Sequence, residues 1–84
     1  MSNGYEKPFN LLKEYVGNTV EVVRHDGSVV NGTLQAFDRH VNMVLTDAIV
    51  YSNATDSQHQ EDVGRLFQRG GSVTDVRPAR GDNQ

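Results

Sequence analysis

The fold is decided by residues 20–47, which read VEVVRHDGSVVNGTLQAFDRHVNMVLTD. This stretch opens with apolar and acidic residues in alternation, the pattern of a strand with one buried face. The Asp26-Gly27 pair that follows is a strong signal for a tight hairpin turn. We therefore expect a second strand over residues 29–37 to fold back on the first, with a sharp bend or a close backbone approach at Gly32.

Outward from this stretch, the sequence predicts three more strands. A third strand, rich in β-branched and large apolar residues, is expected over residues 41–51, after a tight connection at residues 38–40. The remaining expected elements are a polar loop over 52–62, a fourth strand over 63–69, a Gly70-Gly71 turn and a fifth strand over 72–77, ended by Pro78.

A short helix is expected before the sheet. Pro8 suits the first turn of a helix, and the apolar residues Phe9, Leu12 and Val16 then fall on one face. Gly17 is placed to end the helix in a left-handed conformation. A helix of about two turns is too short to be stable alone, so we expect it to dock on the sheet.

Together these elements predict a mainly β fold, in which a short N-terminal helix precedes a five-stranded, strongly bent antiparallel sheet that forms a small open barrel. We expect this domain to span residues 8–78, between flexible tails at residues 1–7 and 79–84. An open barrel leaves two edge strands, and none of the expected strands has an internal proline or a lysine that would keep another chain away. Head-to-tail pairing of such edges closes into a ring when the rotation allows it.

The amino-acid composition excludes several kinds of functional site. The chain has 84 residues, a net charge of −3 and no cysteine. The absence of cysteine excludes disulfides and thiolate metal sites and fits a reducing compartment. The three histidines, His25, His40 and His59, lack ligand-like spacing, so we expect no metal and no cofactor. The acidic balance argues against a basic surface that wraps duplex nucleic acid but leaves room for a local positive site around Arg39 and Arg69.

Membrane and export signals are missing from the sequence. No apolar run approaches the length of a membrane span, and the first residues have neither the basic nor the apolar part of a signal peptide. We therefore expect no membrane partner and a cytoplasmic location, or a nuclear one in a eukaryote.

The connection after the second expected strand gathers side chains suited to reading a nucleotide base. His40 is planar and can stack, Asn42 carries an amide that can hydrogen-bond a base edge, and Asp38 can orient that amide. Farther along, Arg69 adds a guanidinium beside Gly70, which allows close backbone approach. Recognition of single-stranded RNA needs planar groups and a short amide of this kind. An enzyme would need an activated nucleophile or paired carboxylates, which the sequence lacks, so we expect binding and not catalysis.

These residues resemble the Sm/Lsm family of small, ring-forming RNA-binding proteins. The first Sm motif matches over residues 20–47, and its most specific part is the run Phe-Asp-x-His-Val-Asn that ends at Asn42. The second motif matches more loosely over residues 66–73, which read LFQRGGSV. The resemblance covers about residues 8–78, and the lack of a Tyr-Lys-His type of second motif favours the archaeal/eukaryotic branch over the bacterial Hfq branch.

The resemblance implies roles for five residues at the central pore of a ring. His40 and Arg69 would stack on opposite faces of one base, usually uracil. Asn42 would hydrogen-bond the base edge, Asp38 would hold Asn42 in place, and Gly70 would let the backbone approach the base.

The family also implies partners. The expected ligand is single-stranded U-rich RNA, and the expected assembly is a homo-oligomeric ring of six or seven subunits or a mixed ring with paralogues. In such a ring, the fourth strand of one subunit pairs with the fifth strand of the next. The implied function is that of an RNA chaperone or a ribonucleoprotein scaffold.

An alternative function stays open at this point. The asparagine common soon after the Arg-Gly pair in the family is replaced here by Gly71-Ser72. With the acidic balance, this departure favours a structural assembly module of the same fold that binds protein partners and has a degenerate RNA site. The intact set of Asp38, His40 and Asn42 opposes that interpretation, although each residue alone would also suit an ordinary surface turn.

Overall fold

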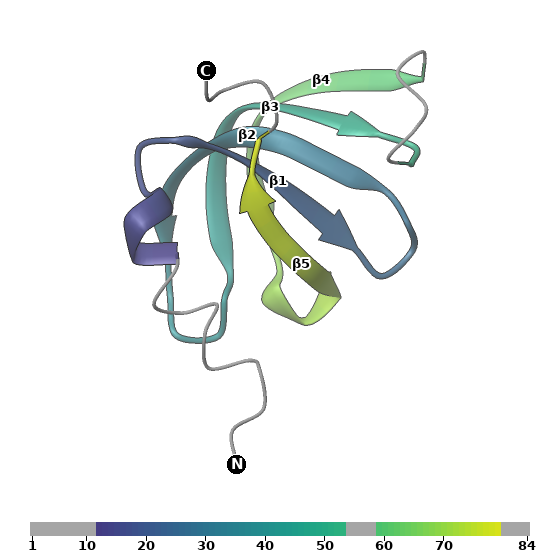
Figure 1. Cartoon of the computed structure of the whole chain (residues 1–84). Helices are drawn as coiled ribbons and strands as arrows, with labels where there is room; N and C mark the ends of the chain where they lie inside the picture. Colours follow the sequence, from purple (N-terminus) through teal and green to yellow (C-terminus); the bar gives the residue numbers. More distant parts are fainter. Residues whose placement is uncertain (1–11, 54–58, 80–84) are drawn as a thin grey trace.

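The computed structural model describes residues 12–53 and 59–79, which form a short helix and a bent five-stranded sheet (Figure 1). The strands are β1 (Thr19–Arg24), β2 (Val29–Phe37), β3 (Met43–Tyr51), β4 (Gln60–Gln68) and β5 (Val73–Pro78), and a 3-10 turn, η2 (Gly70–Ser72), joins the last two. Neighbouring strands are antiparallel, in the order β4-β3-β2-β1-β5. This order confirms the predicted fold and leaves β4 and β5 as its two edges.

The helix is described over residues 12–15, and it docks on the sheet as expected. Its Leu12 side chain is fully buried. Gly17 ends the helix with a φ of 90°, and its N–H donates to the Leu34 carbonyl at 2.8 Å. The expected helix start at Pro8 and Phe9 lies outside the described residues, and no helix in the described ranges is long and apolar enough to cross a membrane.

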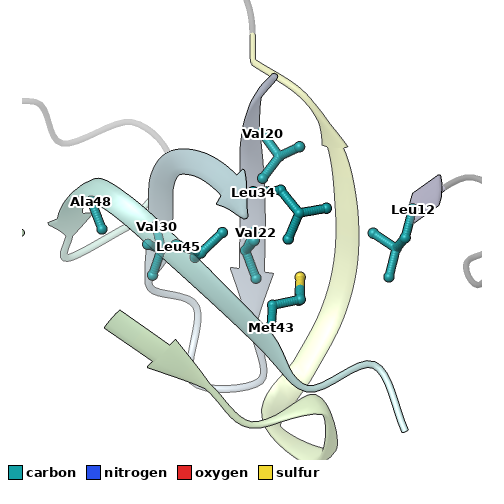
Figure 2. Packing of buried hydrophobic residues seen from close by; sticks show 8 residues of the cluster. All are labelled: Leu12, Val20, Val22, Val30, Leu34, Met43, Leu45 and Ala48. Carbon is teal, nitrogen blue, oxygen red and sulfur yellow. The ribbon is translucent and has the colours of Figure 1, made fainter. Parts of the chain in front are cut away.

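Eight buried apolar side chains form the core inside the curve of the sheet (Figure 2). They are Leu12, Val20, Val22, Val30, Leu34, Met43, Leu45 and Ala48. The β1 and β2 members recur at alternate positions, because successive side chains of a strand point to opposite faces. Figure 2 shows Leu12 at one end of this cluster, where the helix covers the barrel.

The sheet bends at Gly32, as predicted. A Cβ at this position would lie 3.1 Å from the Thr46 carbonyl oxygen and 3.2 Å from the Ala48 Cα, so the β3 backbone passes very close to it. The pairing of β2 with β3 shifts register between Asn31 and Thr33, on either side of the glycine. A register shift of this kind sharpens the local twist and helps the sheet to curl.

The third strand starts later than predicted. It begins at Met43 and not at Val41, because Val41 has a left-handed backbone with a φ of 67°. Such a backbone interrupts a strand, so the connection extends through Asn42.

The fourth strand starts earlier than predicted, at Gln60 and not at residue 63. Its first three residues are polar and exposed, and they pair with residues 49–51 of β3. Backbone hydrogen bonds hold an edge strand regardless of its side chains, so side-chain alternation does not reveal this part of β4. Residues 60–62 therefore belong to β4 and not to the loop expected over 52–62.

Candidate nucleic-acid interface

Asp38 closes the turn between β2 and β3. Its carboxylate Oδ1 accepts hydrogen bonds from the backbone N–H groups of His40 at 2.8 Å and Asn42 at 3.1 Å. Its backbone N–H donates to the Asn42 carbonyl at 3.0 Å, and its carbonyl accepts from the Val41 N–H at 2.9 Å. Aspartate commonly shapes turns in this way, so Asp38 has a structural role whatever else it does.

The Asn42 side chain is held at both ends. Its Nδ2 donates to Asp38 Oδ2 at 3.1 Å, and its Oδ1 accepts from the Gly70 N–H at 2.7 Å. These two contacts fix which end of the amide carries the hydrogens. Each end keeps one further bonding position, an N–H on the nitrogen and a lone pair on the oxygen. Asn42 therefore links the turn after β2 to the turn after β4 and retains the capacity to bind a base edge.

Hydrogen bonds also favour the ionised form of Asp38. The Asn42 amide lowers the pKa of this carboxyl below its ordinary value of 3.8, and the backbone N–H groups of His40 and Asn42 lower it further, while desolvation acts in the opposite direction. A lowered pKa in the folded state means that the resulting stabilisation is complete above the unfolded value and is lost only as the pH falls through the folded value. Asp38 therefore holds Asn42 at neutral pH.

Gly70 is required by the packing of the two turns. It starts η2, and a Cβ built on it would overlap the His40 carbonyl oxygen and lie 2.8 Å from the Val41 carbonyl carbon. Only a residue without a side chain fits there. The resemblance implied that Gly70 brings the backbone near a bound base, and the structure adds that Gly70 brings the two turns together.

His40 and Arg69 lie next to this contact. The His40 carbonyl faces Gly70, and Arg69 directly precedes Gly70, so the two side chains extend from adjoining points of the two turns. Both residues are exposed. Within residues 12–53 and 59–79, the contacts of Arg69 are made by its backbone and none by its guanidinium, which leaves the flat face and the donors of that group available to a ligand.

Gly71 and Ser72, where the sequence departs from the family pattern, complete the 3-10 turn. The Ser72 N–H donates to the Arg69 carbonyl at 3.1 Å, and the His25 N–H from the β1–β2 turn donates to the Ser72 carbonyl at 2.8 Å. The Val73 N–H donates to the Gly70 carbonyl. The departure therefore leaves a well-connected turn beside Arg69.

Gln68 and Arg24 lie near the site and were not singled out from the sequence. Gln68 is buried and bonded to both Arg24 and the Arg69 backbone. A signal was available, because Gln68 follows Leu66 at the two-residue spacing of a strand and so belongs to the same face of β4. A hollow of about 410 Å³ lies beside these residues, between the β1–β2 turn and the end of β4. In the part of the chain that the structure describes, no group of three or more histidine, aspartate or glutamate side chains is arranged to hold a metal ion.

Comparisons with known proteins agree with the resemblance seen in the sequence. The model of the LSM domain family matches residues 10–78. A probable U6 snRNA-associated Sm-like protein from Encephalitozoon cuniculi is 38% identical over 71 residues, which cover 84% of this chain and 90% of that relative.

Solved structures agree as well. A heptameric archaeal Sm protein superposes with a TM-score of 0.72 and 28% identity, over 83% of this chain and 97% of the other. The Sm protein of Pyrococcus abyssii in complex with a uridine heptamer superposes with a TM-score of 0.73 and 25% identity, over 86% of this chain and 97% of the other.

Proposed function

The chain belongs to the LSM domain family, and on this basis we propose that it forms a ring that binds short, single-stranded, U-rich RNA. The observation that carries the proposal is the Asn42 amide, fixed between the Asp38 carboxylate and the Gly70 N–H. The protein would act as an RNA chaperone or as a ribonucleoprotein scaffold in the cytoplasm, or in the nucleus of a eukaryote. This function needs no cofactor and no reacting group.

The fixed amide supplies a physical reason for a preference among bases. Uracil presents a carbonyl acceptor next to an N–H donor, whereas cytosine and adenine present an amino donor next to a ring-nitrogen acceptor. Because Asp38 sets the orientation of Asn42, a base with the opposite order of groups would place donor against donor. Guanine shares the order of uracil, so the amide alone does not separate these two bases. His40 and Arg69 would add stacking on the two faces of the base, each base gaining about 1–3 kcal/mol.

The ring follows from the two free edges of the sheet. Phe67 on the edge strand β4 is 61% exposed, more than any other large apolar side chain that the structure describes. Pairing of β4 with β5 of a neighbour would satisfy the edge backbone and remove Phe67 from water. Val73 contributes little to such a seam, because it packs against the core of its own subunit. A ring of six or seven copies, alone or with paralogues, would then present equivalent sites to successive nucleotides and gain affinity through effective concentration.

Binding of oligo-U, oligo-A and oligo-C to the full chain, measured by fluorescence anisotropy, tests the proposal. We expect oligo-U to bind at least about tenfold more tightly than the other two, since a correctly paired base edge contributes about 1–3 kcal/mol of discrimination. Equal affinities would contradict base reading. The absence of any RNA binding would favour the assembly module that binds protein partners.

A further inference from the structure

Gln68 occupies an unusual place for a polar side chain. It is the last residue of β4, it is only 4% exposed, and it lies on the inward face together with Leu66. Burial of an amide is unfavourable unless its polar atoms find partners, and an apolar residue would fill the same position without that cost. The reason for a glutamine must therefore lie in what its amide binds.

Both ends of the Gln68 amide are bonded. Its Oε1 accepts from the Arg24 guanidinium at 3.3 Å, and its Nε2 donates to the Arg69 carbonyl at 3.1 Å. Arg24 ends β1, where the pairing with β5 shifts register, and its Nε donates to the Ser28 hydroxyl at 2.8 Å. That hydroxyl in turn donates to Asp26 at 2.6 Å. Gln68 and Arg24 thus link the Arg69 backbone to the β1–β2 turn.

The peptide unit between Arg69 and Gly70 is held from two sides. Its carbonyl accepts from Gln68 and from the Ser72 N–H, and its N–H donates to Asn42 Oδ1. A peptide unit is planar, so the direction of its carbonyl sets the direction of its N–H. Gln68, together with the Ser72 N–H, therefore sets how the Gly70 N–H meets the amide of Asn42, although Gln68 itself lies inside the protein.

We propose that Gln68 is a positioning residue for base recognition, acting through the Arg69–Gly70 peptide on Asn42. This role rests on the proposed RNA function, because it concerns the accuracy with which the amide of Asn42 is presented. It assigns the U preference partly to a buried residue that no base would touch.

The test uses two substitutions of Gln68 in the full chain. Gln68→Met keeps the volume but removes both hydrogen bonds. Gln68→Glu keeps an acceptor for Arg24, and its ionised form lacks the donor for the Arg69 carbonyl. We expect both variants to bind oligo-U about 3- to 10-fold more weakly, with a lower ratio of oligo-U to oligo-A affinity. We also expect hydrogen exchange of the Gly70 amide to accelerate by about tenfold, while the amides of Val22 and Val30 in the core strands stay protected.

A matched control is Gln35→Met. The Gln35 amide is exposed and donates to the Thr46 hydroxyl at 3.0 Å on the outer surface of the sheet, so its loss should change neither readout.

Several outcomes separate the positioning role from the proposed function. Unchanged exchange at Gly70 in Gln68→Met would overturn the positioning role, as would faster exchange with an unchanged oligo-U to oligo-A ratio. A wild-type chain without any oligo-U preference would overturn the proposed function itself, and the role in base recognition with it. If Gln68→Met does not fold, Gln68→Glu decides by the same two readouts.

Discussion

Replacing Gly70 with alanine should lower the affinity for oligo-U by more than about 100-fold, because stacking and base reading are lost together. The new Cβ would overlap the His40 carbonyl oxygen and crowd the Val41 carbonyl carbon, so the two turns must move apart. That movement breaks the 2.7 Å bond from the Gly70 N–H to Asn42 and displaces Arg69 from His40. The crowding should also destabilise the fold by about 1–3 kcal/mol, measurable by denaturant unfolding.

The neighbouring glycine provides a control of the same chemistry. A Cβ added at Gly71 would meet no atom within 4 Å, so Gly71→Ala should bind oligo-U like the wild type. Anisotropy measurements on the two variants isolate the effect of the contact between the turns. If Gly70→Ala binds oligo-U within about threefold of the affinity of Gly71→Ala, the difference in binding free energy is well under 1.4 kcal/mol. That result would show that the contact between the turns does not support binding.

Val76→Pro should convert the ring into folded single subunits. The N–H of Ala79, just past β5, donates to the Thr19 carbonyl of β1 at 3.1 Å. N–H groups along a strand point to alternate sides, and the pairing of β5 with β1 is regular from Asp75 to Pro78, so the Val76 N–H faces the free edge. A proline there removes a donor needed by a neighbouring strand but none that holds its own subunit, and edge strands tolerate proline in that orientation.

The mass of the assembly and the binding of RNA should change together in this variant. Sedimentation should report a single subunit, circular dichroism should stay that of the wild type, and apparent oligo-U affinity should fall by about 100-fold as multivalency is lost. Val76→Ala keeps the N–H, removes most of the side chain and should remain a ring. A proline variant of unchanged mass would contradict pairing through this edge. Val73 is less suitable for the experiment, because its N–H already donates to the Gly70 carbonyl inside the subunit.

The sequence predicted the fold well wherever side-chain burial sets the structure. The bounds of β2 match the prediction, since its apolar alternation and the Asp26-Gly27 turn both act locally. The start of β4 could not be predicted in the same way, because residues 60–62 pair through their backbones with both faces exposed. The start of β3 depends on the left-handed backbone of Val41. A β-branched residue rarely adopts this conformation, so the sequence does not indicate it.

In the candidate site too, local contacts could be predicted from the sequence and long-range contacts could not. The contact of Asp38 with Asn42 could be expected, because the two residues lie four apart in one turn. The bond from Gly70 to Asn42 joins residues 28 positions apart and depends on the closure of the barrel. The role of Gln68 depends on that closure too, since its partner Arg24 lies 44 positions away. Such long-range contacts leave only weak signals in a single sequence.

The most direct test of base reading is the ratio of oligo-U to oligo-A affinity in Asn42→Ala, measured by anisotropy alongside the mass of the assembly. Removal of the amide should lower this ratio by at least about tenfold, toward one, because the base edge then has no directed partner. The ring should persist, since Asn42 lies on neither edge strand. A ratio equal to that of the wild type, in an intact ring, would contradict the proposal that Asn42 reads the base.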